Sequence, residues 1–198
     1  MNLIVLSSSR GTTFEAVLER IKDGTLTSRC LGLITDRLDR GCIEKAKKFD
    51  IPFLVVDRMK DETREAYDDR LQTAIEELGG DGKDTVIAAL GWMWIFSPSF
   101  VHAWRHRIIN VHPSLLPNYP GAHSLQDALS AGDTETGMTI HLIDEGIDTG
   151  KILLQKKCPI LPQDTLETLK AREQELEKEW YPKVLGMIEM GQMMLPSA

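Results

Sequence analysis

Short apolar runs alternate with longer amphipathic segments along the first half of the chain. The apolar runs predict buried β-strands at Asn2–Leu6, Leu31–Thr35, Pro52–Val56 and Asp84–Leu90. The segments between them carry apolar residues at helical spacing and predict helices at Phe14–Ile21, Ile43–Phe49 and Glu62–Leu78. Strands that alternate with helices in this way are typical of βαβ units, so we predict a parallel sheet.

The pattern changes after Ile109. Two strand-like runs, Met138–Ile143 and Lys151–Ile160, enclose the turn-rich segment Asp144–Gly150, which indicates a hairpin-like excursion. The charged segment Thr165–Met190 predicts a closing helix with a solvated outer face. We therefore expect a single α/β domain over residues 1–198. Its fold class is a doubly wound, mostly parallel sheet with helices on both faces, and such sheets bind ligands at the carboxyl ends of their strands.

Charge and cysteine content narrow the function classes. The 198 residues include 23 Lys and Arg against 30 Asp and Glu, a net charge of −7, which argues against binding to a nucleic-acid backbone. Cys30, Cys42 and Cys158 form no CxxC pair, which argues against a disulfide framework and a cysteine-rich zinc site. No apolar run approaches the roughly 18 residues of a membrane span. We expect a cytoplasmic protein with no nucleic-acid or membrane partner.

The first strand is followed by a small, hydroxyl-rich loop, Ser7–Thr13, that leads into a helix. Backbone N–H groups and the positive end of a helix dipole at such a junction suit a phosphate group. The loop matches neither the Walker pattern nor GxGxxG, because no GK[ST] follows and Gly11 is its only glycine. A plain strand-to-helix turn is an equally good interpretation.

The segment Arg107–Gly121 carries the most informative chemistry. An apolar strand ends in Asn110-Val-His112, and alternation along a strand places the two polar side chains on one face. Pro113 then interrupts the strand. An amide donor and an imidazole side by side at a strand end can reach one developing oxyanion. The alternative is a hydrogen-bonded turn histidine without a catalytic role.

Two further clusters of polar residues have competing interpretations. Asp144 and Asp148 lie in a glycine-bearing loop that lacks the spacing of an EF-hand; the loop is either acidic and exposed, or it directs one carboxylate toward His112. His102 and His106 stand four residues apart without the glutamate of HExxH, so we expect a surface helix face there. We expect no metal site.

Together these residues resemble the folate-dependent glycinamide ribonucleotide (phosphoribosylglycinamide) formyltransferase family. The similarity runs from MNLIVL through EKEWYP and is most specific in NVHPSLLPNYPGAH and GMTIHLIDEGIDTG. It implies a Rossmann-like formyltransferase fold, with a phosphate-binding mononucleotide half at 1–100 and a catalytic and folate-binding half at 101–198. The implied reaction moves the formyl group of 10-formyltetrahydrofolate, a co-substrate, to the amine of glycinamide ribonucleotide in de novo purine (IMP) biosynthesis. No metal is required.

The resemblance also implies roles for individual residues. The catalytic set falls on Asn110, His112 and Asp148, where Asp148 is preferred to Asp144 as the second acid of DEGIDTG. The ribonucleotide-binding residues would be Gly11, Thr12, Thr13, Gln174, Glu175, Leu176 and Glu177. The folate-binding residues would be Arg64, Met93, Trp94, Ile95, Phe96, Asn110, Asp144, Glu145, Gly146, Ile147 and Asp148.

Three residues depart from the family pattern: Ser9 stands where glycine is usual, Thr13 where asparagine is usual, and Trp94 where arginine is frequent. We expect the hydroxyl groups of Thr12 and Thr13 to donate to a phosphate in place of the missing amide. We expect the Trp94 ring to cover the folate. An N-formyltransferase for another small amine, such as an amino-sugar nucleotide, and a catalytically inactive folate- or nucleotide-binding module are the alternative functions. A homodimer is left open.

Overall fold

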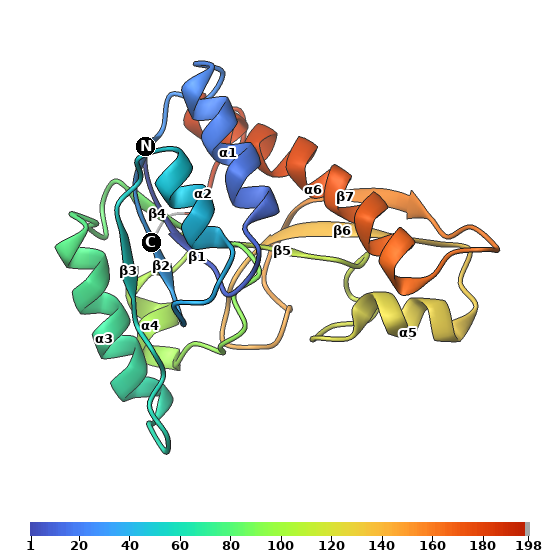
Figure 1. Cartoon of the computed structure of the whole chain (residues 1–198), viewed down its shortest axis with the longest axis horizontal. Helices are drawn as coiled ribbons and strands as arrows, with labels where there is room; N and C mark the ends of the chain where they lie inside the picture. The colour runs from blue at the N-terminus through green and yellow to red at the C-terminus, as the bar shows by residue number, and fades with distance from the viewer. Residues whose placement is uncertain (197–198) are drawn as a thin grey trace.

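Seven strands form one sheet in the computed structural model, which describes residues 1–196 (Figure 1). The strand order is β3-β2-β1-β4-β5-β6-β7, with parallel pairing from β3 through β5 and antiparallel pairing of β6 with both neighbours. The strands are β1 (Asn2–Leu6), β2 (Arg29–Thr35), β3 (Phe53–Val55), β4 (Thr85–Ala89), β5 (Ile108–His112), β6 (Glu135–Leu142) and β7 (Ile152–Pro159). The predicted mostly parallel sheet is confirmed.

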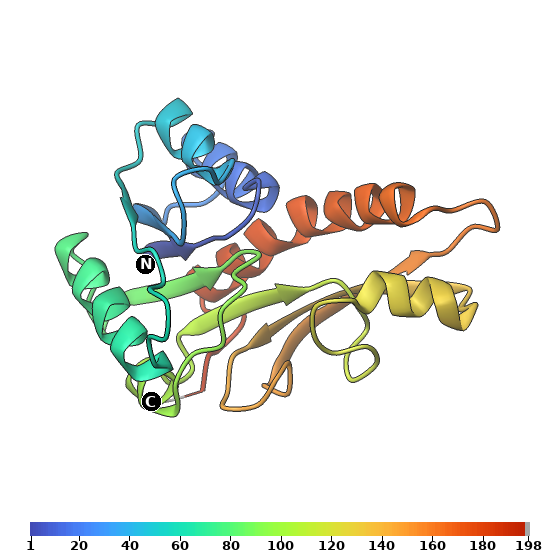
Figure 2. The same ribbon diagram turned by 60° about the horizontal axis from the view of Figure 1, so that its bottom comes forward.

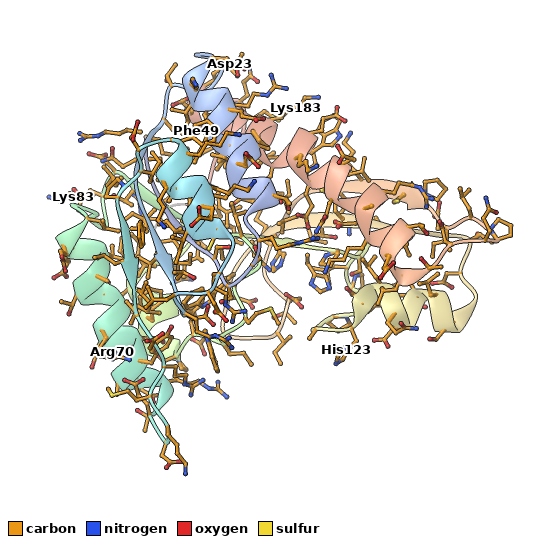
Figure 3. The ribbon with its side chains drawn as sticks, in the orientation of Figure 1. Asp23, Phe49, Arg70, Lys83, His123 and Lys183 are labelled. Carbon is orange, nitrogen blue, oxygen red and sulfur yellow. The ribbon has the colours of Figure 1, made fainter. Side chains whose placement is uncertain are left out.

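Helices cover both faces of this sheet, as predicted (Figures 1 and 2). One face carries α1 (Thr12–Lys22), α2 (Cys42–Lys48) and α6 (Leu166–Glu189), and the other carries α3 (Arg64–Glu77) and α4 (Pro98–Ala103). The remaining helix, α5 (Ser124–Ala131), packs against α6.

Strand β1 shows why a continuous apolar run forms the centre of the sheet. Leu3 and Val5 are buried against the first layer of helices, while Ile4 and Leu6 are buried against the second. Because successive side chains point to opposite faces, a strand between two helical layers has no position that faces water. The run NLIVL therefore folds as a central strand.

Strands β6 and β7 form the predicted hairpin around the loop 143–151. Gly150 is required where this loop returns, because a Cβ atom on it would lie 1.8 Å from the carbonyl oxygen of Leu142. The loop thereby folds back over the end of β5, and it brings Asp144 and Asp148 to that edge of the sheet.

The prediction gave no bounds for the two short helices α4 and α5. They contain six and eight residues, PSFVHA and SLQDALSA. The expectation of a helix face shared by His102 and His106 is wrong. Helix α4 ends at Ala103, and His106 has a left-handed backbone with φ 61°. Between residues 1 and 196, no helix combines the length and apolar character that a membrane crossing needs.

Candidate active site

A cavity of about 780 Å³ opens at the carboxyl ends of β1, β4 and β5. The chain leaves β1 toward β2 and β3 and later returns to β4 on the other side, so the strand order reverses between β1 and β4. Ligands of doubly wound sheets bind at this reversal, and a cavity of this volume accommodates a drug-sized molecule or larger. Helix α6 and the β6–β7 loop close its sides.

The cavity gathers most of the residues implied by the resemblance. Those that line it are Thr12, Thr13, Met93, Trp94, Ile95, Phe96, Asn110, His112, Asp144, Gly146, Ile147, Asp148, Gln174 and Glu177. Gly11, Arg64, Glu145, Glu175 and Leu176 are not among the lining residues. Of the four consecutive residues 174–177, only the first and the last line the cavity, because successive residues of a helix point in different directions. Glu175 pairs with Lys178 on the surface, and Leu176 packs into an apolar cluster.

His112 at the end of β5 has an acceptor beside each ring nitrogen. Its Nδ1 lies 3.4 Å from Oδ2 of Asp148, and its Nε2 lies 2.8 Å from the carbonyl oxygen of Tyr119. Both neighbours accept hydrogen bonds, so the imidazolium form of His112 can donate to both at once. The Asp148 contact is the longer one, as is common before a substrate is bound, and it leaves Nδ1 able to share its proton.

Asp148, rather than Asp144, is the carboxylate that approaches His112. Oδ2 of Asp148 accepts a hydrogen bond from the backbone N–H of Gly121 at 2.8 Å, while Asp144 accepts from Gly146 and Thr149 within its own loop. Burial by itself raises the pKa of Asp148. Hydrogen bonds from His141 and Gly121 and the positive charge at His112 outweigh it and bring that pKa below the usual value. Asp148 is therefore an anion at neutral pH.

Sequence reasoning missed His141, a buried residue of β6. The β5–β6 register sets it directly opposite Asn110, and its Nε2 lies 3.1 Å from Nδ2 of Asn110. Its Nδ1 lies 2.9 Å from the carbonyl oxygen of Leu142, which only accepts, so Nδ1 carries a proton. With Nε2 unprotonated, this nitrogen accepts from the Asn110 amide and leaves the second amide N–H for the cavity. With Nε2 protonated, it can donate to Oδ1 of Asp148, 3.5 Å away, instead. His141 lies within GMTIHLIDEGIDTG, one of the two runs in which the family resemblance is most specific.

The loop before α1 forms one end of the cavity. Gly11 takes the N-cap position with φ 77°, and a Cβ atom there would meet the backbone of Cys42 at 2.8 Å. Thr12 and Thr13 follow at the start of the helix, where free N–H groups point outward. The Thr13 hydroxyl differs from our expectation: it donates to Oε2 of Glu177 at 2.6 Å, because α6 packs across this end of α1.

The segment Trp92–Phe96 forms the opposite end. The Trp94 indole N–H donates to Oδ2 of Asp36 at 3.1 Å, and the Arg58 guanidinium stacks over the ring with its carbon 4.7 Å from the centroid. A cation therefore lies beside this position although arginine itself is replaced. Met93 and Ile95 are exposed to the cavity mouth, where apolar surface suits a flat aromatic ligand.

The described residues, 1–196, contain no candidate metal centre. No three His, Cys, Asp or Glu side chains converge there as ligands for one ion. The polar groups that converge at the cavity centre are an amide, an imidazole and a carboxylate, which suit hydrogen bonding and proton transfer.

This fold and this cluster at the end of β5 define the class of protein. The chain belongs to the formyl transferase family, whose model matches residues 1–185. Among curated relatives, phosphoribosylglycinamide formyltransferase of Bacillus subtilis (strain 168) is 36% identical over 184 residues, which cover 93% of this chain and 92% of that protein. The trifunctional purine biosynthetic protein adenosine-3 of Drosophila pseudoobscura pseudoobscura is 37% identical over 189 residues. That alignment covers 94% of this chain but 14% of the length of the trifunctional protein.

Solved structures agree with the family assignment. Glycinamide ribonucleotide transformylase 1 from Symbiobacterium toebii superposes with a TM-score of 0.92 at 30% identity, covering 100% of this chain and 91% of that one. Phosphoribosylglycinamide formyltransferase from Bacillus halodurans gives a TM-score of 0.89 at 34% identity, covering 95% of each chain.

Proposed function

We propose that the protein transfers the formyl group of 10-formyltetrahydrofolate to the amine of glycinamide ribonucleotide, a step of de novo purine biosynthesis. The observation that carries this proposal is the cluster of Asn110, His112 and Asp148 at the centre of one cavity, between a helix amino terminus and an apolar wall. Two of the relatives described above, from Bacillus subtilis and Bacillus halodurans, are named phosphoribosylglycinamide formyltransferase, which supports this proposal.

Asn110 and His112 act on the formyl oxygen and on the leaving nitrogen. The Asn110 amide keeps one N–H for the cavity and donates it to the formyl oxygen as that atom gains negative charge. One such donor is worth about 3 kcal/mol of transition-state stabilisation. His112 as imidazolium adds positive charge and passes a proton toward the folate nitrogen as it leaves, a contribution of roughly 10²–10⁴-fold.

Asp148 orients His112 and balances its charge. Its carboxylate lies beside Nδ1, is anionic at neutral pH and is anchored by the Gly121 N–H. His112 gives its proton to the leaving folate nitrogen and takes up the proton that the amine of the ribonucleotide loses, so it is an imidazolium again at the end of the cycle. Every step uses side chains of this chain, and no metal enters the mechanism.

The two ends of the cavity divide the substrates. We assign phosphate and ribose to the α1 loop with Gln174 and Glu177, and the folate to Met93–Phe96 and the Asp144–Asp148 loop. The phosphate-binding half is residues 1–100 and the catalytic and folate-binding half is residues 101–198, with Met93–Phe96 contributed from the first half. We place the protein in the cytoplasm, which the three free, buried cysteines support.

An ultraviolet assay of folate product formation, with glycinamide ribonucleotide as acceptor, tests the proposal. We expect turnover that depends on both substrates. Turnover with an amino-sugar nucleotide but not with glycinamide ribonucleotide would assign a different amine. Binding of both ligands without product would identify an inactive binding module instead.

A further inference from the structure

Helix α6 brings two carboxyl groups together at the wall of the cavity. Glu173 and Glu177 lie four residues apart on one face of the helix, where such side chains are neighbours, and both line the cavity. Each carboxyl group shifts the pKa of the other. Glu173 is only 1% exposed. Two carboxylates in such contact cannot both stay ionised at low cost, so the pair holds a proton between its members.

The hydrogen-bond partners show which member carries that proton. Oε2 of Glu177 already accepts from the Thr13 hydroxyl of α1 at 2.6 Å, a contact that stabilises the anion. Oε1 of Glu173 is buried, and within residues 1–196 no protein donor reaches it. A buried acceptor without a donor costs about 1–3 kcal/mol. A proton on Glu173, donated to Glu177, satisfies both carboxyl groups.

The groups around the pair favour the same distribution. Burial raises the pKa of Glu173 well above its usual value, and the charge of Glu177 and the Cys158 thiol of β7 raise it further. Lys170, one turn earlier on α6, opposes these effects. Burial also raises the pKa of Glu177, while the hydrogen bonds from Thr13 and Glu173 lower it. Glu173 is therefore the neutral acid of the pair.

We propose that Glu173 is a positioning residue for the ribonucleotide: as a neutral acid it donates to Glu177 and holds that carboxylate ready to accept from the sugar hydroxyl groups. The inference rests on the proposed function, since the ribonucleotide supplies the sugar. Glu177 contacts Thr13 at the start of α1, so a sugar attached to a phosphate on the α1 loop reaches the Glu177 carboxylate.

Two substitutions of Glu173 separate donation from packing. Glu173→Leu fills the site but removes the donor, and we expect the Kd for glycinamide ribonucleotide, measured by calorimetry without folate, to rise about tenfold. Glu173→Gln keeps an N–H donor and should stay within about threefold of wild type. The matched control is Glu179→Gln, the same change on the solvent face of α6, where the side chain pairs with Lys183. The KM for formyl folate should not change in any variant.

Two further measurements report the proton itself. Infrared spectra at neutral pH should contain the C=O stretch of a neutral carboxylic acid in wild type and Glu179→Gln, and lack it in Glu173→Gln. Because the pKa of Glu173 is raised, its donor is present at neutral pH and is lost as the pH rises. The ribonucleotide Kd of wild type should therefore increase on the alkaline side, whereas that of Glu173→Gln should lack this increase.

The outcomes separate this inference from the proposed function. Wild-type affinity in Glu173→Leu, or an infrared spectrum without the acid band, overturns the role of Glu173 even when the enzyme turns over its substrates. A wild-type protein that binds no glycinamide ribonucleotide overturns the proposed function and the sugar contact together. In that case the infrared band still decides whether the two carboxyl groups share a proton.

Discussion

His112 is held between two loop residues whose backbones are left-handed although neither is glycine. Tyr119 has φ 53° and Asp148 has φ 55°, and each presents an acceptor to one ring nitrogen. Such conformations cost of order 1 kcal/mol or more each and persist where the surrounding structure requires them. These two unfavourable backbone conformations place the acceptors that hold the His112 imidazole in the cavity.

We expect His112→Ala and Asp148→Asn each to lower kcat at least about a hundredfold, because the first removes the proton donor and the second its charged partner. Circular dichroism and thermal unfolding should show an intact fold. Steady-state kinetics of the double variant should give a loss much smaller than the product of the single losses, since groups that act as a unit are not additive. Near-wild-type turnover in either single variant would remove that residue from the mechanism.

His141 should act through Asn110. Replacing Asn110 by Ala removes one oxyanion donor and should lower kcat about 10²–10³-fold. His141→Leu removes the ring that orients the Asn110 amide, so we expect a smaller loss of kcat with little change in either KM. When Asn110 is already replaced by Ala, His141→Leu should then lower kcat by a much smaller factor than it does in the wild-type protein. Equal costs in both backgrounds would show that His141 works through Asp148 instead, which lies 3.5 Å from its Nε2.

At the scale of residues, the sequence predicts site residues where the geometry of a single strand is enough to bring them together. Alternation along one strand and the following Pro113 identify Asn110 and His112 as neighbours. The choice of Asp148 over Asp144 needed the family resemblance, because both acids lie in one loop. His141 was missed because its position opposite Asn110 depends on the β5–β6 register, which no local pattern contains.

At the scale of elements, α6 is the helix on which the site depends most. Thr165 caps its amino terminus through a capping box with Thr168, and Arg172 forms a two-pronged ion pair with Asp164 just before the cap. The Arg172 pair and the hydrogen bonds from Leu161 and Thr168 lower the pKa of Asp164 strongly. This end of α6 carries the residues that line the cavity.

Arg172→Gln should therefore destabilise the protein at neutral pH. A carboxyl group whose folded-state pKa is depressed contributes stability above its unfolded value of about 3.9, and that contribution is lost as the pH falls through the folded-state pKa. The difference in urea midpoint between wild type and variant should accordingly shrink in acid. Lys47→Gln, which breaks an exposed pair with Glu44, is the control and should change little at either pH. A difference that stays constant in acid would assign the effect to packing.

Helix periodicity explains both the success and the limits of prediction at this scale. The segments that became α1, α2, α3 and α6 repeat their apolar positions over two or more turns. The resemblance assigned the consecutive residues 174–177 to the ribonucleotide. The helix instead turns Lys170, Glu173, Gln174 and Glu177 toward the cavity. This spacing is visible in the sequence only once the orientation of α6 on α1 is known.

At the scale of the whole molecule, the two ends of the cavity are lined by residues from different parts of the chain. The β1–α1 loop and α6 form one end of the cavity, while the segment after β4 and the β6–β7 loop form the other. The end of β5, with Asn110 and His112, lies between them. The parallel alternation of strands and helices predicted this arrangement in outline, because a reversal of strand order creates such a crevice.

Because the two ends of the cavity are separate, we expect that a substitution at one end weakens the binding of one substrate alone. Thr12→Val removes one hydroxyl at the α1 loop without a change in size, and we expect the KM for glycinamide ribonucleotide to rise about fivefold. Trp94→Ala removes the ring that Asp36 and Arg58 hold at the folate end, and we expect the KM for formyl folate to rise instead. Trp94→Phe, which keeps an aromatic ring, should retain more folate affinity than Trp94→Ala.

Steady-state kinetics in which the concentrations of both substrates are varied give the two KM values of each variant and check this prediction. A ribonucleotide analogue without its phosphate should bind well over tenfold more weakly to wild type, because it loses charge-assisted hydrogen bonds at the start of α1. Thr12→Val and wild type should bind this analogue with nearly equal affinity. In Trp94→Ala, removal of the phosphate should weaken binding by the same factor as in wild type. Because the two ends share no side chain, the double variant should show the sum of the two free-energy changes. If Trp94→Ala instead weakens the ribonucleotide as much as the folate, the two substrates do not occupy opposite ends of the cavity.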